Sequence, residues 1–288
     1  LPGVSLPPNI VPSNVMAEVV TGKDMVVIVV PSHHVRDIAG EISSHISSDT
    51  ILVSAAKGIE NTTHMTMTDV LHDVLPDIRE GNLAVLSGPS FAKEVARRFP
   101  TVITVASKDL AVAETVQRVF ATPYFRVYRN DDPLGVQLGG SVKNVIAIAA
   151  GIIDGLGLGL NTRAALITRG QTEIRRLGLR MGANPRTFTG LAGIGDLILT
   201  CTGDLSRNHT VGKKIGLGEK VADILAGMKM VAEGVKTTLA ARSLADKLGV
   251  GNNPQALDRL RHQMRTAMEP LLAAATSAAP CDDREVTV

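Results

Sequence analysis

Short apolar runs alternate with helix-like stretches between residues 24 and 128. The run at 24–31 is continuous, rich in β-branched residues and stops at a proline, a pattern that predicts a strand buried on both faces. Similar runs predict strands at 50–56, 83–86, 101–106 and 125–128. Helical spacing predicts helices at 34–46, 66–75, 91–98 and 109–120. This alternation with short connections predicts an α/β fold, in which a mostly parallel sheet carries helices on both faces.

The pattern changes near Asp131-Asp132-Pro133, after which the spacing of apolar residues is almost entirely helical. Turns are expected at 155–159, 182–185 and 202–204. The last clear helix covers 236–248 and ends at Gly249, and beyond Gly251 the sequence becomes rich in Ala and Arg. We therefore predict a sheet domain at 1–131, an all-α domain at 132–250 and a divergent tail at 251–288.

One helix of the second domain carries an unusual charge. The stretch 135–153 is too long for a strand and apolar on nearly every side, so it belongs in a core. Lys143, followed by Asn144, is its single charged residue. A lysine there can snorkel, with its stem covering apolar surface. Alternatively it is partly desolvated, and its pKa is lowered into the range of a general acid or base.

Composition limits the class of protein. The chain has 288 residues, is 44% hydrophobic and has a formal net charge of +2, from 30 basic and 28 acidic residues. These values indicate a globular protein and argue against a general nucleic-acid or membrane-surface binder. The two cysteines indicate a reducing compartment, and the uninterrupted apolar runs are shorter than the ~20 residues of a membrane helix. We therefore expect a cytoplasmic protein without a membrane span.

Candidate binding loops follow the predicted strands, because ligands of open parallel sheets sit beyond the carboxyl ends of their strands. Lys57 stands at one such end, and Gly88 and Ser90 lie at the next. Gly88 would let the backbone approach a ligand, and the helix that opens near Ser90 would favour an anion or a hydroxyl group. A solvated lysine and a plain Gly-Pro turn are the alternative interpretations.

A third candidate segment covers 193–208. Asp196 lies in an apolar run, and Thr200 would share its helix face at i+4. Ser206, Arg207 and Asn208 follow a Gly-Asp turn, and a guanidinium between a hydroxyl and an amide suits a phosphate. The alternative is an ordinary helix cap beside a surface arginine.

Several other patterns are discounted. The glycines at 155–160 follow a helix, so they predict an interhelical turn and not a dinucleotide fingerprint. The histidines lack metal-ligand spacing, and we expect no metal site. Cys201 is interpreted as a small buried hydrophobe. For Asp154 and Glu173 the sequence identifies no partner.

Taken together, these segments resemble the bacterial-type NAD(P)-dependent glycerol-3-phosphate dehydrogenase family. The resemblance covers almost everything up to about Gly249 and rests on motifs in a fixed order. They are Val29-Val30-Pro31-Ser32, Ala56-Lys57-Gly58, 86–94, 135–148, 161–170, 193–208 and Val231-Ala232-Glu233-Gly234. It implies a Rossmann-like sheet domain followed by an all-α domain, and a cofactor that is NAD or NADP.

The resemblance also implies roles for individual residues. Lys143 would protonate the developing C2 alkoxide of dihydroxyacetone phosphate, with Lys57, Asp196 and Thr200 around the reacting centre. Substrate contacts would come from Lys57, Gly88, Ser90, Asn144, Asp196, Ser206, Arg207 and Asn208. Cofactor contacts would come from Lys57, Ala92, Arg207, Val231 and Glu233.

Two departures from the family pattern are expected to matter. The family begins with a strand, a G-x-G-x-x-G turn and a helix, which this chain does not contain, so the sheet domain is expected to be incomplete at its N-terminus. After Val250 the pattern stops and the divergent tail follows. The residues present do not distinguish NAD from NADP, because the missing unit would read the ribose 2′ position.

We therefore expect an oxidoreductase that interconverts sn-glycerol 3-phosphate and dihydroxyacetone phosphate and supplies glycerophospholipid synthesis. Its partner would be a small phosphorylated substrate, and a homodimer is the expected assembly. One alternative is a related two-domain dehydrogenase acting on another hydroxy acid. The other is a truncated, non-catalytic remnant that folds without holding the dinucleotide.

Overall fold

The computed structural model describes residues 3–228 and 232–250 of the chain. A five-stranded sheet in the order β1-β2-β3-β4-β5 organises the first part. Its strands are β1 (Met25–Ile28), β2 (Ile51–Ser54), β3 (Leu83–Ser87), β4 (Thr101–Ser107) and β5 (Phe125–Asn130). Neighbouring strands are parallel except for β3 and β4, which pair antiparallel. The prediction of a mostly parallel sheet is confirmed.

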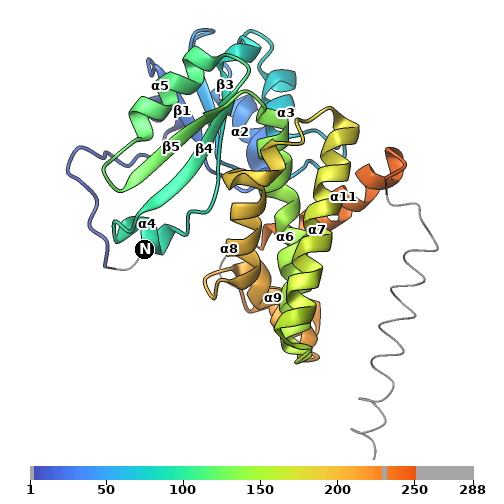
Figure 1. Cartoon of the computed structure of the whole chain (residues 1–288). Helices are drawn as coiled ribbons and strands as arrows, with labels where there is room; N and C mark the ends of the chain where they lie inside the picture. The colour runs from blue at the N-terminus through green and yellow to red at the C-terminus, as the bar shows by residue number, and fades with distance from the viewer. Residues whose placement is uncertain (1–2, 229–231, 251–288) are drawn as a thin grey trace, which may run out of the picture. The chain divides into compact units, whose positions relative to one another are not determined.

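Helices cover both faces of this sheet (Figure 1). They are α1 (Met16–Val20), α2 (Val35–Ile42), α3 (Met67–Val74) and α5 (Leu110–Phe120), whereas the short α4 (Ala92–Ala96) has no buried residue. Adjacent residues of β2 point to opposite faces, as the strand period requires. Leu52 packs with α2 and α3, whereas Val53 packs with α5, and both side chains are fully buried. The continuous apolar run of β2 thus reflects burial on two sides.

The first strand corrects one expectation. β1 is an outer strand of the sheet, and it is shorter than the predicted 24–31. Val27 is 39% exposed and Val29 is 68% exposed, so this run is not buried on both faces. A β-branched run does not distinguish an edge strand from a central one, because that difference depends on which strands pair beside it.

The antiparallel pairing of β3 and β4 was not predicted either. A parallel connection must carry the chain back along the sheet, usually through a helix. The segment 88–100 contains only α4, which has five residues. The chain therefore turns back into β4 beside β3, and the longer α5 makes the parallel crossover from β4 to β5.

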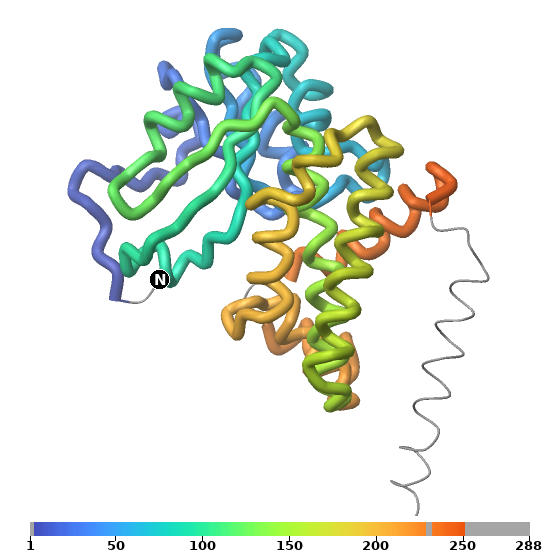
Figure 2. The backbone as a smooth tube through the Cα atoms, in the orientation of Figure 1, coloured from blue at the N-terminus to red at the C-terminus, as the bar shows by residue number. Residues whose placement is uncertain are grey.

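The second part of the chain is helical (Figure 2). Its helices are α6 (Pro133–Gly155), α7 (Gly159–Met181), α8 (Asp196–Thr202), α9 (Arg207–Gly216), α10 (Val221–Ala226) and α11 (Glu233–Lys247). Helix α6 packs against α7, α8, α9 and α11, and its first half also meets β3 and β4. The predicted central helix is therefore the element that joins the sheet to the helical region.

The sequence explains where α6 begins. Asp132 caps its N-terminus by accepting a hydrogen bond from the Gly135 N–H at 2.8 Å, and Pro133 occupies the first turn, where no N–H is needed. The other Asp132 oxygen accepts from the Thr187 hydroxyl at 2.6 Å and from the Asn184 N–H at 2.9 Å. One side chain therefore caps α6 and ties it to the segment after α7.

By length and composition α6 could cross a membrane, since its most apolar window has a mean hydropathy of 1.5. However, 72% of that window is buried inside the protein. An apolar helix surrounded by protein is the usual core helix of a globular domain. The division at residues 131 and 132 stays a prediction, and the tail at 251–288 lies outside the described residues.

Candidate active site

Lys143 lies in the middle of α6, and its side chain is only 6% exposed. Its ammonium group forms an ion pair with Asp196 Oδ1 and donates a hydrogen bond to Thr200 Oγ1 at 2.8 Å. The Thr200 hydroxyl donates in turn to the Asp196 main-chain oxygen at 2.6 Å. Because an ammonium group has three hydrogens, these two contacts leave one for a further acceptor.

Helix α8 presents both partners of Lys143. Asp196 begins α8 and Thr200 follows one turn later, so the two share one face. A single turn of π-helix, Leu191–Gly195, precedes α8 and sets its direction. A Cβ at Gly193 would lie 2.2 Å from the Phe188 carbonyl oxygen, so this tight turn requires glycine. The glycine-rich lead into Asp196 therefore has a geometric reason.

Lys57 enters the same site from the carboxyl end of β2. Its Nζ donates to Asp196 Oδ2 at 2.9 Å, and its side chain is 27% exposed. A Cβ on Gly140 of α6 would meet the Ser87 hydroxyl at 2.6 Å and the Lys57 stem at 3.9 Å. The next residue, Ser141, donates to the Gly58 carbonyl at 3.1 Å. Small residues on α6 thus let two strand ends come close to Lys143.

The three charged groups of this site, Lys57, Lys143 and Asp196, shift the pKa values of Lys143 and Asp196. Burial together with the positive charge of Lys57 lowers the pKa of Lys143 from 10.5 to about 7, although Asp196 acts in the opposite direction. Burial by itself would raise the pKa of Asp196, whose side chain is 2% exposed, but Lys57 and Lys143 hold that pKa below its ordinary value. The site therefore holds an ionised carboxylate, Asp196, and a lysine, Lys143, that can donate or accept a proton near neutral pH.

The loop after β3 borders the site. Gly88 has a φ of +147°, and a Cβ there would lie 3.0 Å from the Ile103 Cα, so the position requires glycine. Ser90 is exposed and donates to the Gly88 carbonyl at 3.1 Å. Ala92 is exposed at the start of α4, and a Cβ on Gly203 would touch the Phe91 ring at 2.7 Å. The loop therefore packs against the end of α8.

The predicted phosphate residues open α9. Ser206 caps this helix by accepting from the His209 N–H at 3.2 Å, so the cap that was weighed as an alternative is present. Arg207 is exposed, and Asn208 is buried and accepts from the Gly234 N–H at 3.0 Å. Asn144 is buried on α6, and its carbonyl lies close to Gly234. A helix start with a hydroxyl and a guanidinium remains suited to an anion.

A polar contact joins the end of β1 to α11. Glu233, the first residue of α11, is half-buried and accepts a hydrogen bond from the Ser32 hydroxyl at 2.9 Å. A Cβ on Gly58 would lie 2.2 Å from that hydroxyl oxygen, so glycine leaves the space that Ser32 fills. Ser32 belongs to the first motif of the family resemblance, but the sequence assigned it no role. Val231 lies outside the described residues.

Two carboxylates without a predicted partner have one in the structure. Asp154 Oδ2 accepts from Arg163 Nη1 at 2.7 Å and pairs with His209 Nε2 at 2.8 Å, while Glu173 forms an i,i+4 pair with Arg169. A lone acid at the end of an apolar helix was the available signal, but its partners lie on two other helices.

Cys201 is fully buried, and burial raises the pKa of its thiol to about 12.

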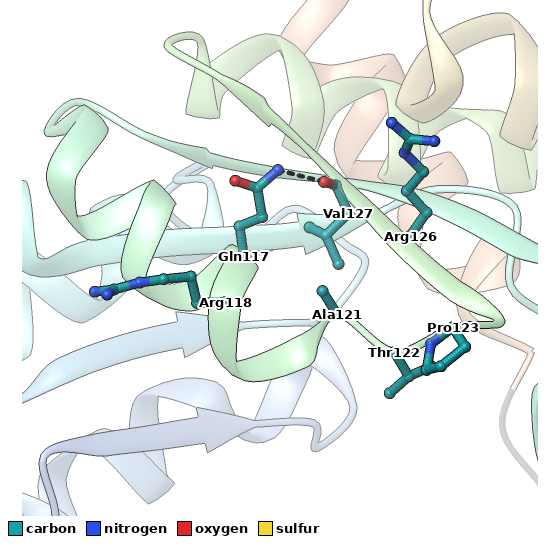
Figure 3. Close-up of a pocket in the computed structure, with 7 residues that line it drawn as sticks. All are labelled: Gln117, Arg118, Ala121, Thr122, Pro123, Arg126 and Val127. Atoms are coloured by element: carbon teal, nitrogen blue, oxygen red, sulfur yellow. Dashed lines mark hydrogen bonds between the residues drawn. The ribbon is translucent and has the colours of Figure 1, made fainter.

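The structure also has a shallow depression between α5 and β5 (Figure 3). The Gln117 amide spans it and donates to the Val127 carbonyl at 2.6 Å. None of the predicted site residues lines this depression. Within residues 3–228 and 232–250, no three His, Cys, Asp or Glu side chains gather as metal ligands would. The chemistry therefore concentrates at the carboxyl ends of the strands, beside Lys143.

These charged side chains lie at the carboxyl ends of parallel strands, where open α/β sheets such as those of dinucleotide-dependent dehydrogenases bind their ligands. The family models described as the N-terminus and the C-terminus of NAD-dependent glycerol-3-phosphate dehydrogenase match residues 1–113 and 132–260 of the chain. The chain belongs to this dehydrogenase family.

Individual relatives agree with this assignment. The glycerol-3-phosphate dehydrogenase (NAD(P)+) of Syntrophotalea carbinolica is 58% identical over 250 residues, which are 87% of this chain and 75% of the relative. The enzyme of the same name from Geobacter sulfurreducens is 57% identical over equal shares. The crystal structure of glycerol-3-phosphate dehydrogenase from Coxiella burnetii is 39% identical with a TM-score of 0.76, covering 80% of this chain and 69% of that one.

Proposed function

We propose that this protein interconverts sn-glycerol 3-phosphate and dihydroxyacetone phosphate, with NAD or NADP as the hydride carrier. The observation that carries the proposal is the ion pair of Lys143 with Asp196, buried beside Lys57 at the carboxyl edge of the sheet. Family membership supports the same reaction. The chain spans about three-quarters of the length of its first relatives, with 75% covered in each case.

The bound nicotinamide supplies or accepts the hydride. When the ketone is reduced, Lys143 donates a proton to the oxygen on C2, and in the opposite direction the neutral amine removes it. Asp196 and Thr200 hold the ammonium group of Lys143 in place through the contacts described above. Burial and the positive charge of Lys57 lower the pKa of Lys143 to about 7, so both protonation states are accessible at neutral pH.

The substrate phosphate would lie at the start of α9. Ser206 and Arg207 would donate hydrogen bonds to its oxygens, and the helix N-terminus adds favourable partial charge. Asn208 would contribute its amide hydrogens, since its carbonyl oxygen already accepts from Gly234. Further substrate contacts would come from Lys57, Gly88, Ser90, Asn144 and Asp196.

The residues near the carboxyl edge fit the nicotinamide half of a dinucleotide. The close approach of Ser32 to Gly58 and its hydrogen bond to Glu233 bring that carboxylate to the ends of β1 and β2. Carboxylate and hydroxyl groups there can bind the amide and ribose of a nicotinamide nucleotide. Lys57, Ala92, Arg207 and Glu233 would make these contacts, together with Val231. The chain contains no G-x-G-x-x-G sequence, so its residues leave the choice between NAD and NADP open.

A coupled pair of measurements tests the proposal. Fluorescence titration with NADH and NADPH measures cofactor binding by the whole chain, and loss of NAD(P)H absorbance with dihydroxyacetone phosphate measures turnover. Dihydroxyacetone without the phosphate is the matched substrate, and we expect at least a tenfold lower kcat/KM for it. Saturable binding without turnover of either ketone would refute the proposed substrate. No saturable binding would instead identify a non-catalytic chain.

Three further properties belong to the same proposal. We place the enzyme in the cytoplasm, where its product would supply glycerophospholipid synthesis. We also propose a homodimer, which light scattering of the purified chain tests by its mass. Finally, we propose that the sheet domain ends at residue 131 and the helical domain covers 132–250, which limited proteolysis near Asp131 tests.

A further inference from the structure

A second charged cluster lies on α6, about three helical turns beyond Lys143. Asp154, in the last turn of α6, accepts hydrogen bonds at one oxygen from Arg163 of α7 and from the His209 imidazole of α9. The Asp154 side chain is 19% exposed and that of His209 is 8% exposed. A charged network this far from the reacting lysine takes no part in the proton transfer described above.

The carboxylate of this network is charged in the folded protein. Burial by itself would raise the pKa of Asp154, but the hydrogen bonds from Arg163 and His209 hold it below its ordinary value. Because the carboxylate is partly buried, removing one of these partners would leave a charge with fewer hydrogen bonds in a poorly solvated position. The network therefore fixes the positions of the helices that carry it.

His209 connects this network to the predicted phosphate residues. Its backbone N–H donates to the Ser206 hydroxyl, while its side chain reaches Asp154. The backbone around His209 also lies against α6, because a Cβ on Gly151 would be 2.1 Å from the His209 carbonyl oxygen. The first turn of α9 is thus fixed to α6 directly behind Ser206 and Arg207.

Lys143 and Asp154 lie on the same helix, and Asp154 holds His209 of α9. Helix α6 therefore sets the distance between the proton donor and the phosphate residues. The substrate has a fixed length between its phosphate and C2, so the start of α9 must stay at a matching distance from Lys143. We propose that His209 and Asp154 are positioning residues, which hold the start of α9 for the substrate phosphate. This inference rests on the proposed function.

Two substitutions at one position test the inference. His209→Leu keeps much of the volume but removes the hydrogen bond to Asp154, whereas His209→Gln places an amide N–H near the position of Nε2. We expect His209→Leu to raise the KM for dihydroxyacetone phosphate about tenfold, with kcat within about threefold. Glutamine should restore most of that loss. Calorimetry with sn-glycerol 3-phosphate and with inorganic phosphate should show the highest affinity for the parent, a slightly lower one for His209→Gln and the lowest for His209→Leu.

The unphosphorylated substrate separates positioning from general damage. A variant that only loosens the fold would lose activity towards dihydroxyacetone and dihydroxyacetone phosphate alike. We expect the selective loss for the phosphorylated ketone, with little change for dihydroxyacetone. Equal losses for both ketones, or equal behaviour of the Leu and Gln variants, would overturn the inference.

A second pair of variants covers the case in which His209→Leu does not fold. Asp154→Asn keeps the shape of the acceptor but removes its charge, and Glu173→Gln makes the same change at the exposed i,i+4 pair on α7. We expect a raised KM for the first variant and an unchanged KM for the second. An unchanged KM for Asp154→Asn would also overturn the inference. If the parent chain itself shows no preference for the phosphorylated ketone, the proposed function fails instead.

Discussion

Lys143 Nζ lies 2.8 Å from Thr200 Oγ1, inside a site where Asp196 binds the same ammonium group. The threonine hydroxyl accepts from the ammonium through a lone pair while it donates its own hydrogen to the Asp196 backbone oxygen. The direction of these hydrogen bonds therefore aims the remaining hydrogen of Lys143 away from α8.

Replacement of Lys143 should abolish most of the activity. Lys143→Met keeps the apolar stem and removes the proton donor, so we expect kcat for dihydroxyacetone phosphate to fall at least ~100-fold. Lys108→Met is the control, because Lys108 is an exposed lysine paired with Glu80. Steady-state assays with NADH or NADPH measure both. A loss below about tenfold would be too small for a general acid.

The reaction should depend on pH in opposite senses in its two directions. Reduction requires the protonated Lys143, so its kcat/KM should fall as pH rises through about 7, whereas oxidation should rise through the same pH. Lys57→Met removes a positive charge that lowers the pKa of Lys143, so the midpoint should move to higher pH. Profiles of kcat/KM for the parent and the variant measure this shift. Coinciding midpoints would contradict the electrostatic role of Lys57.

The packing of α6 on α9 should tolerate no side chain at its glycines. A Cβ on Gly212 would lie 1.9 Å from the Ile148 carbonyl oxygen, and backbone cannot move aside as a flexible side chain can. We expect Gly212→Ala to lower the free energy of unfolding by about 1 to 3 kcal/mol. Gly40→Ala is the matched helical control, since nothing lies within 4 Å of its Cβ. Urea denaturation should leave this control unchanged or slightly stabilised.

Cys201 should be unreactive in the folded protein. Its side chain is fully buried, and its raised pKa of about 12 leaves almost no thiolate at pH 8. The chain's second cysteine is Cys281, so the test uses a Cys281→Ser variant, in which a thiol reagent at pH 8 should titrate no thiol before denaturation and one thiol after it. Rapid labelling of the native variant would show that α8 opens readily.

The elements of this fold follow from local sequence patterns. The runs that form β2 to β5 and the long apolar helix α6 were predictable, because burial on one or two faces imposes a period that the chain displays. The cap at Asp132 and the turn at Gly182, where φ is +93°, follow from the conformations that their residues favour. The pattern of apolar residues does not show which strands pair with each other, or in which direction. The exposure of β1 and the antiparallel β4 were missed for that reason.

By itself, the sequence determined that Lys143 is a charge in an apolar helix and that Asp196 and Thr200 share a helix face. Only the tertiary structure shows that Asp196 contacts both Lys57 and Lys143, and that burial together with the positive charge of Lys57 lowers the pKa of Lys143. It also decided that Asp154 meets His209 and that Ser32 meets Glu233. These pairs are far apart in the chain, and periodicity describes only which face a residue occupies. The burial of a side chain, its distance from a partner and its pKa depend on how separate elements pack together.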